Sequence, residues 1–349
     1  MIKIVNPVAI WLCVISVHFI TGCDSTPESV ATWQHSAVGT LDASISKDGR
    51  FALVSSVNHQ AGFWDLEKNE LLFQWRHNEN PESGIIATAI SPDGTRAITA
   101  DNRTFVIWDT SSGKAYGYWE APAQISAVAL SDSGKHVLLG LRSGKVVHIN
   151  METGRRLEFT AHRVEPVASI DMSANGLWAI SGASDGRAIV WNTETGKPTY
   201  VFEHDTRVTL VKFDSRGDLA FSSGTRGNAF IWDLTNGSLV TRLQLKPREY
   251  VTTSAVFSMK GDRIATGAPD KDIVLWSTRN GEKLGSWKAK TRDVWKPTGA
   301  IVWAVAFDAD EQHLLTEASS GFGQKWSLQE LSSEQELEEI DSAKDQIIE

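Results

Sequence analysis

The chain has 349 residues, of which 41% are hydrophobic and 22% are charged, and this composition is typical of a folded globular protein rather than a disordered one. The formal net charge is −9 and no concentrated run of basic residues appears, which argues against a nucleic-acid partner. The only cysteines are Cys13 and Cys23, so residues 24–349 cannot form a disulfide among themselves.

The N-terminal segment has the order of a secretion signal. Lys3 supplies a short positive region, residues 8–20 are mostly apolar, and a polar stretch begins after Cys23. The apolar run is shorter than a bilayer-spanning helix and suits a signal peptide. Its end, Ile20-Thr21-Gly22-Cys23, resembles the lipobox of bacterial lipoproteins. That resemblance implies cleavage before Cys23 and lipid on its thiol and on the new amine; an uncleaved anchor or an ordinary signal peptide are the alternatives.

The residue after the lipobox bears on the membrane that holds the chain. By resemblance to enterobacterial lipoproteins, Asp24 beside the lipidated cysteine implies retention in the inner membrane. We therefore expect a signal peptide over residues 1–22 and a linker over 23–29. The mature chain is expected to be lipid-anchored in the bacterial cell envelope, facing the periplasm, at the inner rather than the outer membrane. Attachment through more than one acyl chain is stable rather than reversible.

From residue 30 onwards, a pattern of strands and turns recurs roughly every 40–45 residues. Short β-favouring runs, such as 208–213 and 219–223, are separated by turns that contain glycine. The residues that close the third strand of each unit form one series: Trp64, Trp108, Ile149, Trp191, Trp232, Trp276 and Trp326. Two turn series keep the same phase: positions 49, 94, 134, 176, 217 and 261, and positions 69, 113, 154, 196, 237 and 281.

The period, together with strand ends such as Ile107-Trp108-Asp109 and Ile231-Trp232-Asp233, resembles the WD40 repeat family. The resemblance implies four strands per unit, and the predicted fold class is an all-β, seven-bladed β-propeller over residues 30–328. The strand around Trp33 fits the fourth-strand series but precedes the first unit, and no such strand follows Trp326. We expect the Trp33 strand to complete the last blade and close the ring, which removes free sheet edges.

The fourth unit, over residues 181–197, is the best-preserved copy. Resemblance to the family implies a buried hydrogen-bond network there, in which Asp185 orients the His162 imidazole. His162 would meet the Ser181 hydroxyl, which would also accept a hydrogen bond from the Trp191 indole. Only this unit keeps the whole set in sequence, and a buried polar chain stabilises a fold only if every member is satisfied.

These residues invite comparison with a catalytic triad, but the pattern favours a structural role. Residues 182–186 join two strands rather than a strand and a helix, so they form neither a nucleophile elbow nor a phosphate-binding loop. Asp171 and Lys212 fall at matching places on the innermost strands of adjacent blades, where a structural ion pair is expected. No enzymatic activity, no cofactor and no metal site are predicted.

Two segments lie outside the repeat pattern. The connection 288–299 is long and basic in an otherwise acidic chain, and arginine and aromatic residues are enriched where partners bind. The candidate partner-binding residues are Arg292, Trp295, Lys296 and Trp303. A long loop with Trp295 packed against its own blade is the alternative. Residues 329–349 form an acidic tail, with Ser333 and Glu336 as a capping box for a helix that is either solvated or docked.

The predicted function is that of a membrane-anchored periplasmic WD40-repeat lipoprotein that acts as a protein–protein interaction scaffold, with membrane contact through lipidated Cys23. Rigid rings that display many loops suit recognition rather than chemistry. One alternative is a propeller scaffold of the outer-membrane-assembly type, which residues 194–197 resemble in part and which would have eight blades. Another is a lactonase- or dehydrogenase-like propeller enzyme, with acidic or histidine side chains converging on the channel mouth.

Overall fold

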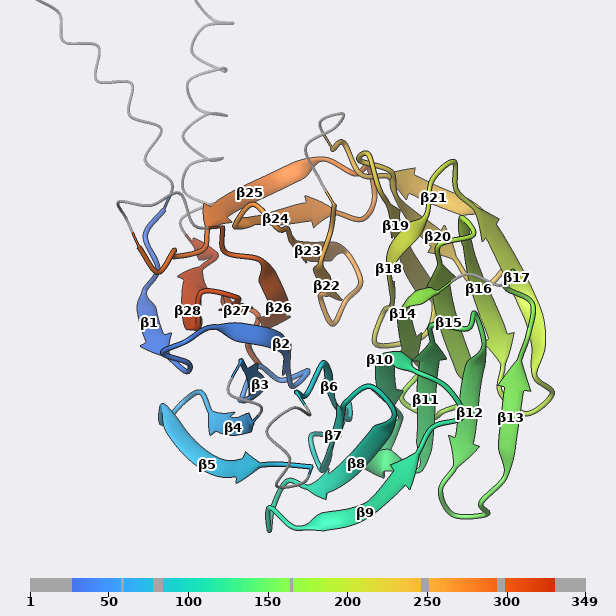
Figure 1. The fold of residues 1–349 in the computed structure, drawn as a ribbon. Coiled ribbons are helices and arrows are strands. Elements are labelled where there is room, and N and C mark those ends of the chain that lie inside the picture. The colour runs from blue at the N-terminus through green and yellow to red at the C-terminus, as the bar shows by residue number, and fades with distance from the viewer. Residues whose placement is uncertain are drawn as a thin grey trace, which may run out of the picture.

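The computed structural model describes residues 27–57, 60–77, 84–163, 166–245, 251–293 and 299–329. They form seven four-stranded antiparallel sheets, arranged as blades around a central axis (Figure 1). The predicted all-β, seven-bladed β-propeller is thus confirmed, and the ring does not have the eight blades of the outer-membrane-assembly alternative. None of the described segments contains an apolar helix of membrane-spanning length.

The first four blades follow one another along the chain, each with its first strand innermost. Blade one contains β2 (Thr40–Ile45), β3 (Phe51–Ser56), β4 (Ala61–Asp65) and β5 (Glu70–Trp75). Blade two contains β6 (Ala87–Ile90), β7 (Arg96–Ala100), β8 (Thr104–Asp109) and β9 (Ala115–Glu120). Blade three contains β10 (Ile125–Leu130), the 3-10 turn η1 (Asp132–Gly134), β11 (His136–Leu141), β12 (Val146–Asn150) and β13 (Arg156–Phe159). Blade four contains β14 (Val167–Met172), β15 (Trp178–Ala183), β16 (Arg187–Asn192) and β17 (Lys197–Glu203).

The remaining blades complete the ring, and the last one draws on both ends of the chain. Blade five contains β18 (Val208–Phe213), β19 (Leu219–Gly224), β20 (Ala229–Asp233) and β21 (Leu239–Arg242). Blade six contains β22 (Ser254–Phe257), β23 (Arg263–Gly267), β24 (Asp272–Ser277) and β25 (Lys283–Lys288). Blade seven contains β26 (Val302–Phe307), β27 (His313–Ala318), β28 (Phe322–Ser327) and, as its outer strand, β1 (Ala31–Gln34).

The ring closes through this pairing of β1 with β28. The two strands are antiparallel, with Ala31 opposite Lys325 and Gln34 opposite Phe322, so the predicted closure by the strand around Trp33 is confirmed. Closure gives the outer edge of β28 a hydrogen-bonded partner from the other end of the chain, which an open sheet would leave free.

The turn series have a common backbone reason. Gly196 has φ of 69°, in the left-handed region that glycine adopts without a side-chain clash. Asn69, the non-glycine member of its series, has φ of 51°, and asparagine tolerates this region better than most residues. Blade seven lacks a glycine in its first turn, and there Glu311 takes the positive φ, at 55°.

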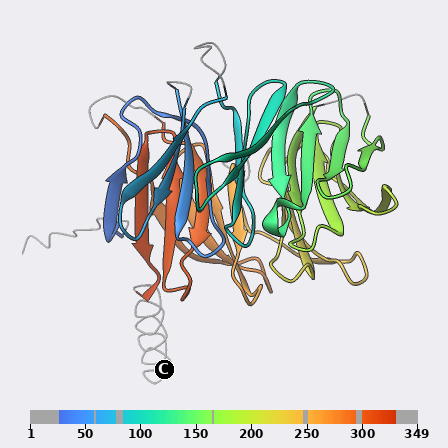
Figure 2. The same cartoon turned by 90° about the horizontal axis from the view of Figure 1, so that it is seen from below.

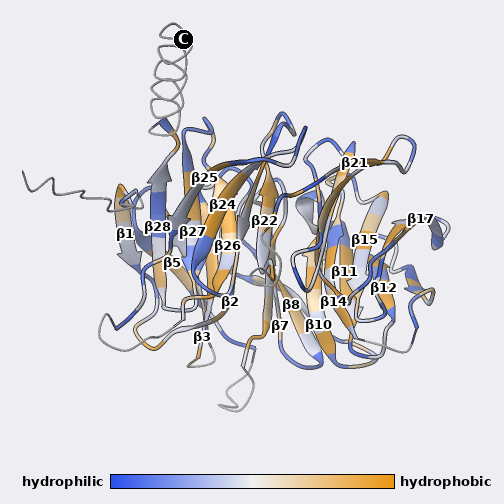
Figure 3. Ribbon diagram, turned by 90° about the horizontal axis from the view of Figure 1, so that it is seen from above, coloured by the Kyte–Doolittle hydropathy of each residue, from blue (hydrophilic) through white to orange (hydrophobic). Residues whose placement is uncertain are grey.

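Regular aromatic positions pack the blades against each other. Trp75 on β5 stacks on Trp108 of the next blade with ring centroids 4.9 Å apart, and Phe159 on β13 stacks on Trp191 at the same distance. Phe202 on β17 stacks on Trp232 of the next blade in the same way, at 4.2 Å, whereas at blade five Leu243 takes the aromatic residue's place and shares a buried cluster with Trp276. Figure 3 shows the hydrophobic residues mainly on the strands and the hydrophilic residues mainly on the connections between them.

Candidate functional site: hydrogen-bond networks, central channel and connecting loops

The blade-four network holds all four residues named from the sequence. His162 Nε2 lies 2.8 Å from Ser181 Oγ, and the Trp191 indole donates to the same oxygen at 2.8 Å. Both carboxylate oxygens of Asp185 lie 3.2 Å from His162 Nδ1. Burial lowers the pKa of His162, although the Asp185 carboxylate acts in the opposite direction. Ser181 is 0% exposed, and its hydroxyl is hydrogen-bonded to both His162 and Trp191. A nucleophilic serine must be accessible to substrate, and Ser181 is not.

A second complete network lies in blade two, and the expectation that blade four alone holds one is wrong. His77 Nε2 lies 2.8 Å from Thr99 Oγ1, and the Trp108 indole donates to that oxygen at 2.8 Å. The carboxylate of Asp101 lies 3.5 Å from His77 Nδ1. Asp101 follows its hydroxyl residue by two positions, whereas Asp185 follows Ser181 by four. A search that required the blade-four spacing therefore missed this network. A search for a hydroxyl residue on the second strand and a tryptophan on the third would have found Thr99 and Trp108.

Blade five keeps only part of this arrangement. His204 Nε2 lies 2.8 Å from Ser222 Oγ, and the Trp232 indole donates to the same oxygen at 2.7 Å. Arg226 stands where blade four has Asp185, and the buried Nδ1 of His204 has no partner among the described residues. Burial lowers the pKa of His204 to about 4.

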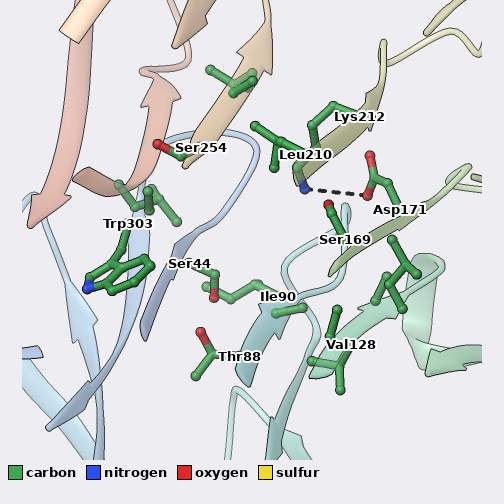
Figure 4. A pocket seen from close by; sticks show the side chains of 18 of the residues that line it. Ser44, Thr88, Ile90, Val128, Ser169, Asp171, Leu210, Lys212, Ser254 and Trp303 are labelled. Atoms are coloured by element: carbon green, nitrogen blue, oxygen red, sulfur yellow. Dashed lines mark ion pairs between the residues drawn. The ribbon is translucent and has the colours of Figure 1, made fainter. Parts of the chain in front are cut away.

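The central channel is a cavity of about 550 Å³, lined by the innermost strands of all seven blades (Figure 4). Lys212 Nζ lies 3.6 Å from Asp171 Oδ1, the ion pair expected from the sequence. The other oxygen of Asp171 accepts a hydrogen bond from the Phe213 backbone at 2.9 Å. Asp171 therefore links its strand, β14, to the neighbouring β18 through both oxygens.

Asp42 makes an equivalent link that the sequence did not single out. One carboxylate oxygen accepts from the Thr88 backbone N–H at 2.6 Å and from the Thr88 hydroxyl at 2.9 Å. Withdrawal from bulk water inside the channel raises the pKa of Asp42 to about 6, although these hydrogen bonds and the Lys212 charge act against the rise. Among the described lining residues there is no histidine, and the acidic groups on β2 and β14 bind the backbone of the next blade.

One group of side chains has the spacing of metal ligands, and it lies outside the channel. Asp308, Asp310 and His313 flank the first turn of blade seven, with their ligand atoms within 4.8 Å of one another. Asp308 already lies 2.7 Å from His313 Nδ1 and 3.2 Å from Lys325 Nζ. This turn is therefore held by its own ion pairs.

The long connection before blade seven is described only in part. Trp295 and Lys296 lie outside the described residues, as do Cys23 and Asp24 at the N-terminus. Arg292 is exposed, and its guanidinium packs against Gly39, where a Cβ would lie only 2.6 Å from Nη2. The Trp303 indole donates to the Thr40 carbonyl at 3.2 Å. The structure thus brings Arg292 and Trp303 against one short segment at the seam between blades seven and one.

Comparisons with known proteins agree with this architecture. Residues 155–192 and 196–233 match the model of the family "WD domain, G-beta repeat". The chain is 23% identical to Autophagy-related protein 16 of Arabidopsis thaliana over 239 residues, covering 67% of this chain and 45% of that protein. It is 32% identical over 130 residues to Eukaryotic translation initiation factor 3 subunit I of Debaryomyces hansenii, covering 37% of this chain and 34% of that protein. The chain thus spans less than half the length of these two relatives.

Two further matches extend around most of the ring. The chain is 19% identical over 281 residues to Target of rapamycin complex subunit LST8 of Bos taurus, covering 76% of this chain and 84% of that protein. A chain in the "Crystal Structure of Mitotic Checkpoint Complex" superposes with a TM-score of 0.71 at 17% identity, covering 93% of this chain and 99% of that one. The class is therefore a seven-bladed β-propeller, and the chain contains WD40 repeats in its central blades.

Proposed function

We propose that the protein is a lipid-anchored scaffold of the bacterial cell envelope, facing the periplasm, whose propeller binds protein partners and catalyses no reaction. The observation that carries this proposal is that the side chains of the kinds that catalyse reactions in enzymes are here bonded to other parts of the protein. The histidine, serine and aspartate side chains of blade four are buried and bonded to one another, and the channel carboxylates bind neighbouring strands. What faces solvent is a rigid ring of connecting loops, which is the arrangement that recognition uses.

The comparisons support the scaffold part of the proposal. Two of the similar proteins are, by name, subunits of larger assemblies: a target of rapamycin complex and a translation initiation factor. The anchored part of the proposal rests on Ile20-Thr21-Gly22-Cys23 and on Asp24 beside it.

Metabolic labelling with a palmitate analogue, followed by membrane fractionation, tests the anchor. The wild-type chain should carry the label and sediment with the inner membrane, whereas Cys23→Ser should lose both. Cys13→Ser, in the segment removed by cleavage, is the matched control and should keep both. Label retained by Cys23→Ser, or recovery of the wild type in the outer membrane, would contradict the anchor or its location.

Crosslinking in cells followed by mass spectrometry tests the scaffold. Specific proteins should be captured by the wild-type chain and lost when Arg292→Ala is combined with Trp295→Ala. An unchanged set of captured proteins would remove the 288–299 connection from the binding surface, and capture of none would overturn the scaffold function.

A further inference from the structure

The connections between strands divide into two faces of the ring, seen edge-on in Figure 2. On one face, the connections that lead from one blade to the next contact the turns between second and third strands. Examples are the Ile125 N–H bonded to the Asn102 carbonyl at 2.8 Å and the Thr225 N–H bonded to the Arg207 carbonyl at 3.2 Å. The opposite face holds the turns between first and second and between third and fourth strands.

The two faces carry opposite charge. On the first, which we call the basic face, the described connections contain ten basic and five acidic residues, a net charge of +5. Its basic residues are Arg76, Arg103, Arg142, Lys145, Arg163, Arg207, Arg226, Lys271, Lys290 and Arg292. On the second, the acidic face, the described turns contain nine basic and thirteen acidic residues, a net charge of −4. Although the whole chain has a net charge of −9, its basic face therefore has a positive electrostatic potential.

Four arginines concentrate this charge over three consecutive blades. Arg142, Arg163, Arg207 and Arg226 come from blades three to five and the connections between them, and all four are exposed. Their guanidinium groups form no ion pair within the described part of the chain, whereas Lys145 beside them pairs with Glu158 at 2.8 Å. We call these four residues the arginine arc.

Blade five lacks one hydrogen bond of the blade-four network at the position of Arg226, a member of the arc. Arg226 occupies the position of Asp185 in blade four, and its backbone has φ of 67°, which residues other than glycine rarely adopt. Without the aspartate, the buried Nδ1 of His204 has no partner among the described residues. Blade five thus carries an exposed arginine at the position where blade four carries a buried, hydrogen-bonded aspartate.

We propose that the arginine arc docks an acidic segment, rich in aspartate and glutamate, of a periplasmic protein partner. The guanidinium group presents a planar fork of donors that matches a carboxylate in two-point contact. Four such groups, none of them in an ion pair among the described residues, are suited to several carboxylates along one polypeptide.

The position of the arc favours a protein over a lipid surface, and this step rests on the proposed anchoring. β1 begins, and β28 ends, at the acidic face, because Ala31 lies opposite Lys325 and Gln34 opposite Phe322. Seven residues lie between Cys23 and Ala31, and this stretch of chain spans at most about 30 Å. An anchor at Cys23 thus holds the acidic face nearer the membrane and leaves the basic face turned towards the periplasm.

Fluorescence anisotropy with the full chain in neutral detergent tests the docking. The probe is a labelled 15-residue peptide of alternating glutamate and serine. The wild type should bind it with an affinity that falls as NaCl rises, and Arg163→Glu with Arg207→Glu should weaken binding at least tenfold. The matched control is Lys114→Glu with Lys260→Glu, two exposed lysines of the acidic face, which changes the net charge equally and should change binding less than twofold.

Thermal unfolding of each variant establishes that it is folded before binding is compared. Equal weakening by both double variants would reduce the effect to overall charge and overturn the proposal, as would absence of peptide binding by the wild type. Arc-dependent binding to phosphatidylglycerol vesicles in place of the peptide would identify a lipid occupant and overturn it as well. Salt-sensitive dimers in sedimentation velocity that Arg163→Glu abolishes would identify a second copy of the chain as the occupant and would likewise overturn the proposal. None of these readouts depends on acylation, so the docking proposal and the proposed lipid anchor can be refuted independently of each other.

Discussion

Blades four and one have the same four-stranded pairing but treat the same network position differently. In blade four, Ser181 on β15 lies opposite Ile170 and accepts from both His162 and the Trp191 indole. In blade one, Val54 lies opposite Ala43 in the equivalent place and offers no hydroxyl.

The consequence in blade one is a redirected histidine. The buried Trp64 Nε1 has no partner within the described residues. His35, at the position of the blade-four histidine, turns instead to Glu317 on β27 of blade seven, at 2.7 Å, with side chains that are 0% and 1% exposed. Its ring lies 4.5 Å from that of Trp64. A histidine at the same position thus bonds to its own blade in one case, His162 to Ser181, and to blade seven in the other, His35 to Glu317, where β1 closes the ring.

The largest effect expected from this comparison concerns the two tryptophans. Trp191→Ala should lower the free energy of unfolding by about 4 kcal/mol, because it removes a side chain that is 1% exposed and hydrogen-bonded. Trp64→Ala should cost about half as much, since Trp64 is only half-buried and its indole has no acceptor. Urea unfolding followed by circular dichroism measures both. Equal losses would show that the network adds nothing to packing.

Next in size is the closure pair. Glu317→Ala should destabilise the chain by about 3 kcal/mol, because it leaves His35 buried without its partner. Glu120→Ala removes an exposed partner of Arg103 at 3.5 Å and should cost less than about 1 kcal/mol. Hydrogen exchange should also show faster exchange of the β1 and β28 amides in the Glu317 variant. Unchanged exchange there would argue against a role in closing the ring.

A smaller loss is expected from the hydroxyl itself. Ser181→Ala should cost about 2 kcal/mol, because both the His162 and Trp191 nitrogens lose the oxygen they share. Ser143→Ala, on an exposed turn, should stay within about 0.5 kcal/mol of the wild type. If the two variants had the same urea midpoint, the blade-four network would be stabilising nothing.

The smallest expected effect is the pH dependence of stability that His148 of blade three and His204, just before blade five, produce. Burial lowers the pKa of His148 and of His204 to about 4, from 6.5. Below about pH 6.5 the unfolded chain takes up these protons first, so stability is complete above that pH and is lost as pH falls towards 4. Because the raised pKa of Asp42 opposes this loss, the net decrease between pH 6.5 and 5.5 should be about 1 kcal/mol.

The matching variant acts on the opposing group. Asp42→Asn removes the carboxyl whose protonation stabilises the folded chain as pH falls from about 6. Urea midpoints measured across this range should therefore fall more steeply for Asp42→Asn than for the wild type. A shallower fall would mean that Asp42 is not the opposing group.

Much of the ring could be predicted from the sequence because each blade repeats a local code. The third-strand series, with tryptophan in six blades and Ile149 in blade three, predicted seven blades together with the turn glycines, and the unpaired Trp33 strand predicted their closure. The blade-two network was missed because Thr99 and Asp101 break the spacing that Ser181 and Asp185 keep, although the folded turn restores their geometry.

The sequence by itself determined the period and the blade count, since these depend on residues close together in the chain. The closure pairs the two ends of the chain, and the sequence indicated it only through the unpaired strand around Trp33. Only the tertiary structure decided that His35 bonds to Glu317, 282 positions away, and that Asp42 and Asp171 bind the backbone of neighbouring blades. It also decided that arginines 19 to 44 residues apart in the chain gather on one face. The physical reason is that the propeller places alternate connections on opposite sides, so charge scattered along the chain becomes separated in space.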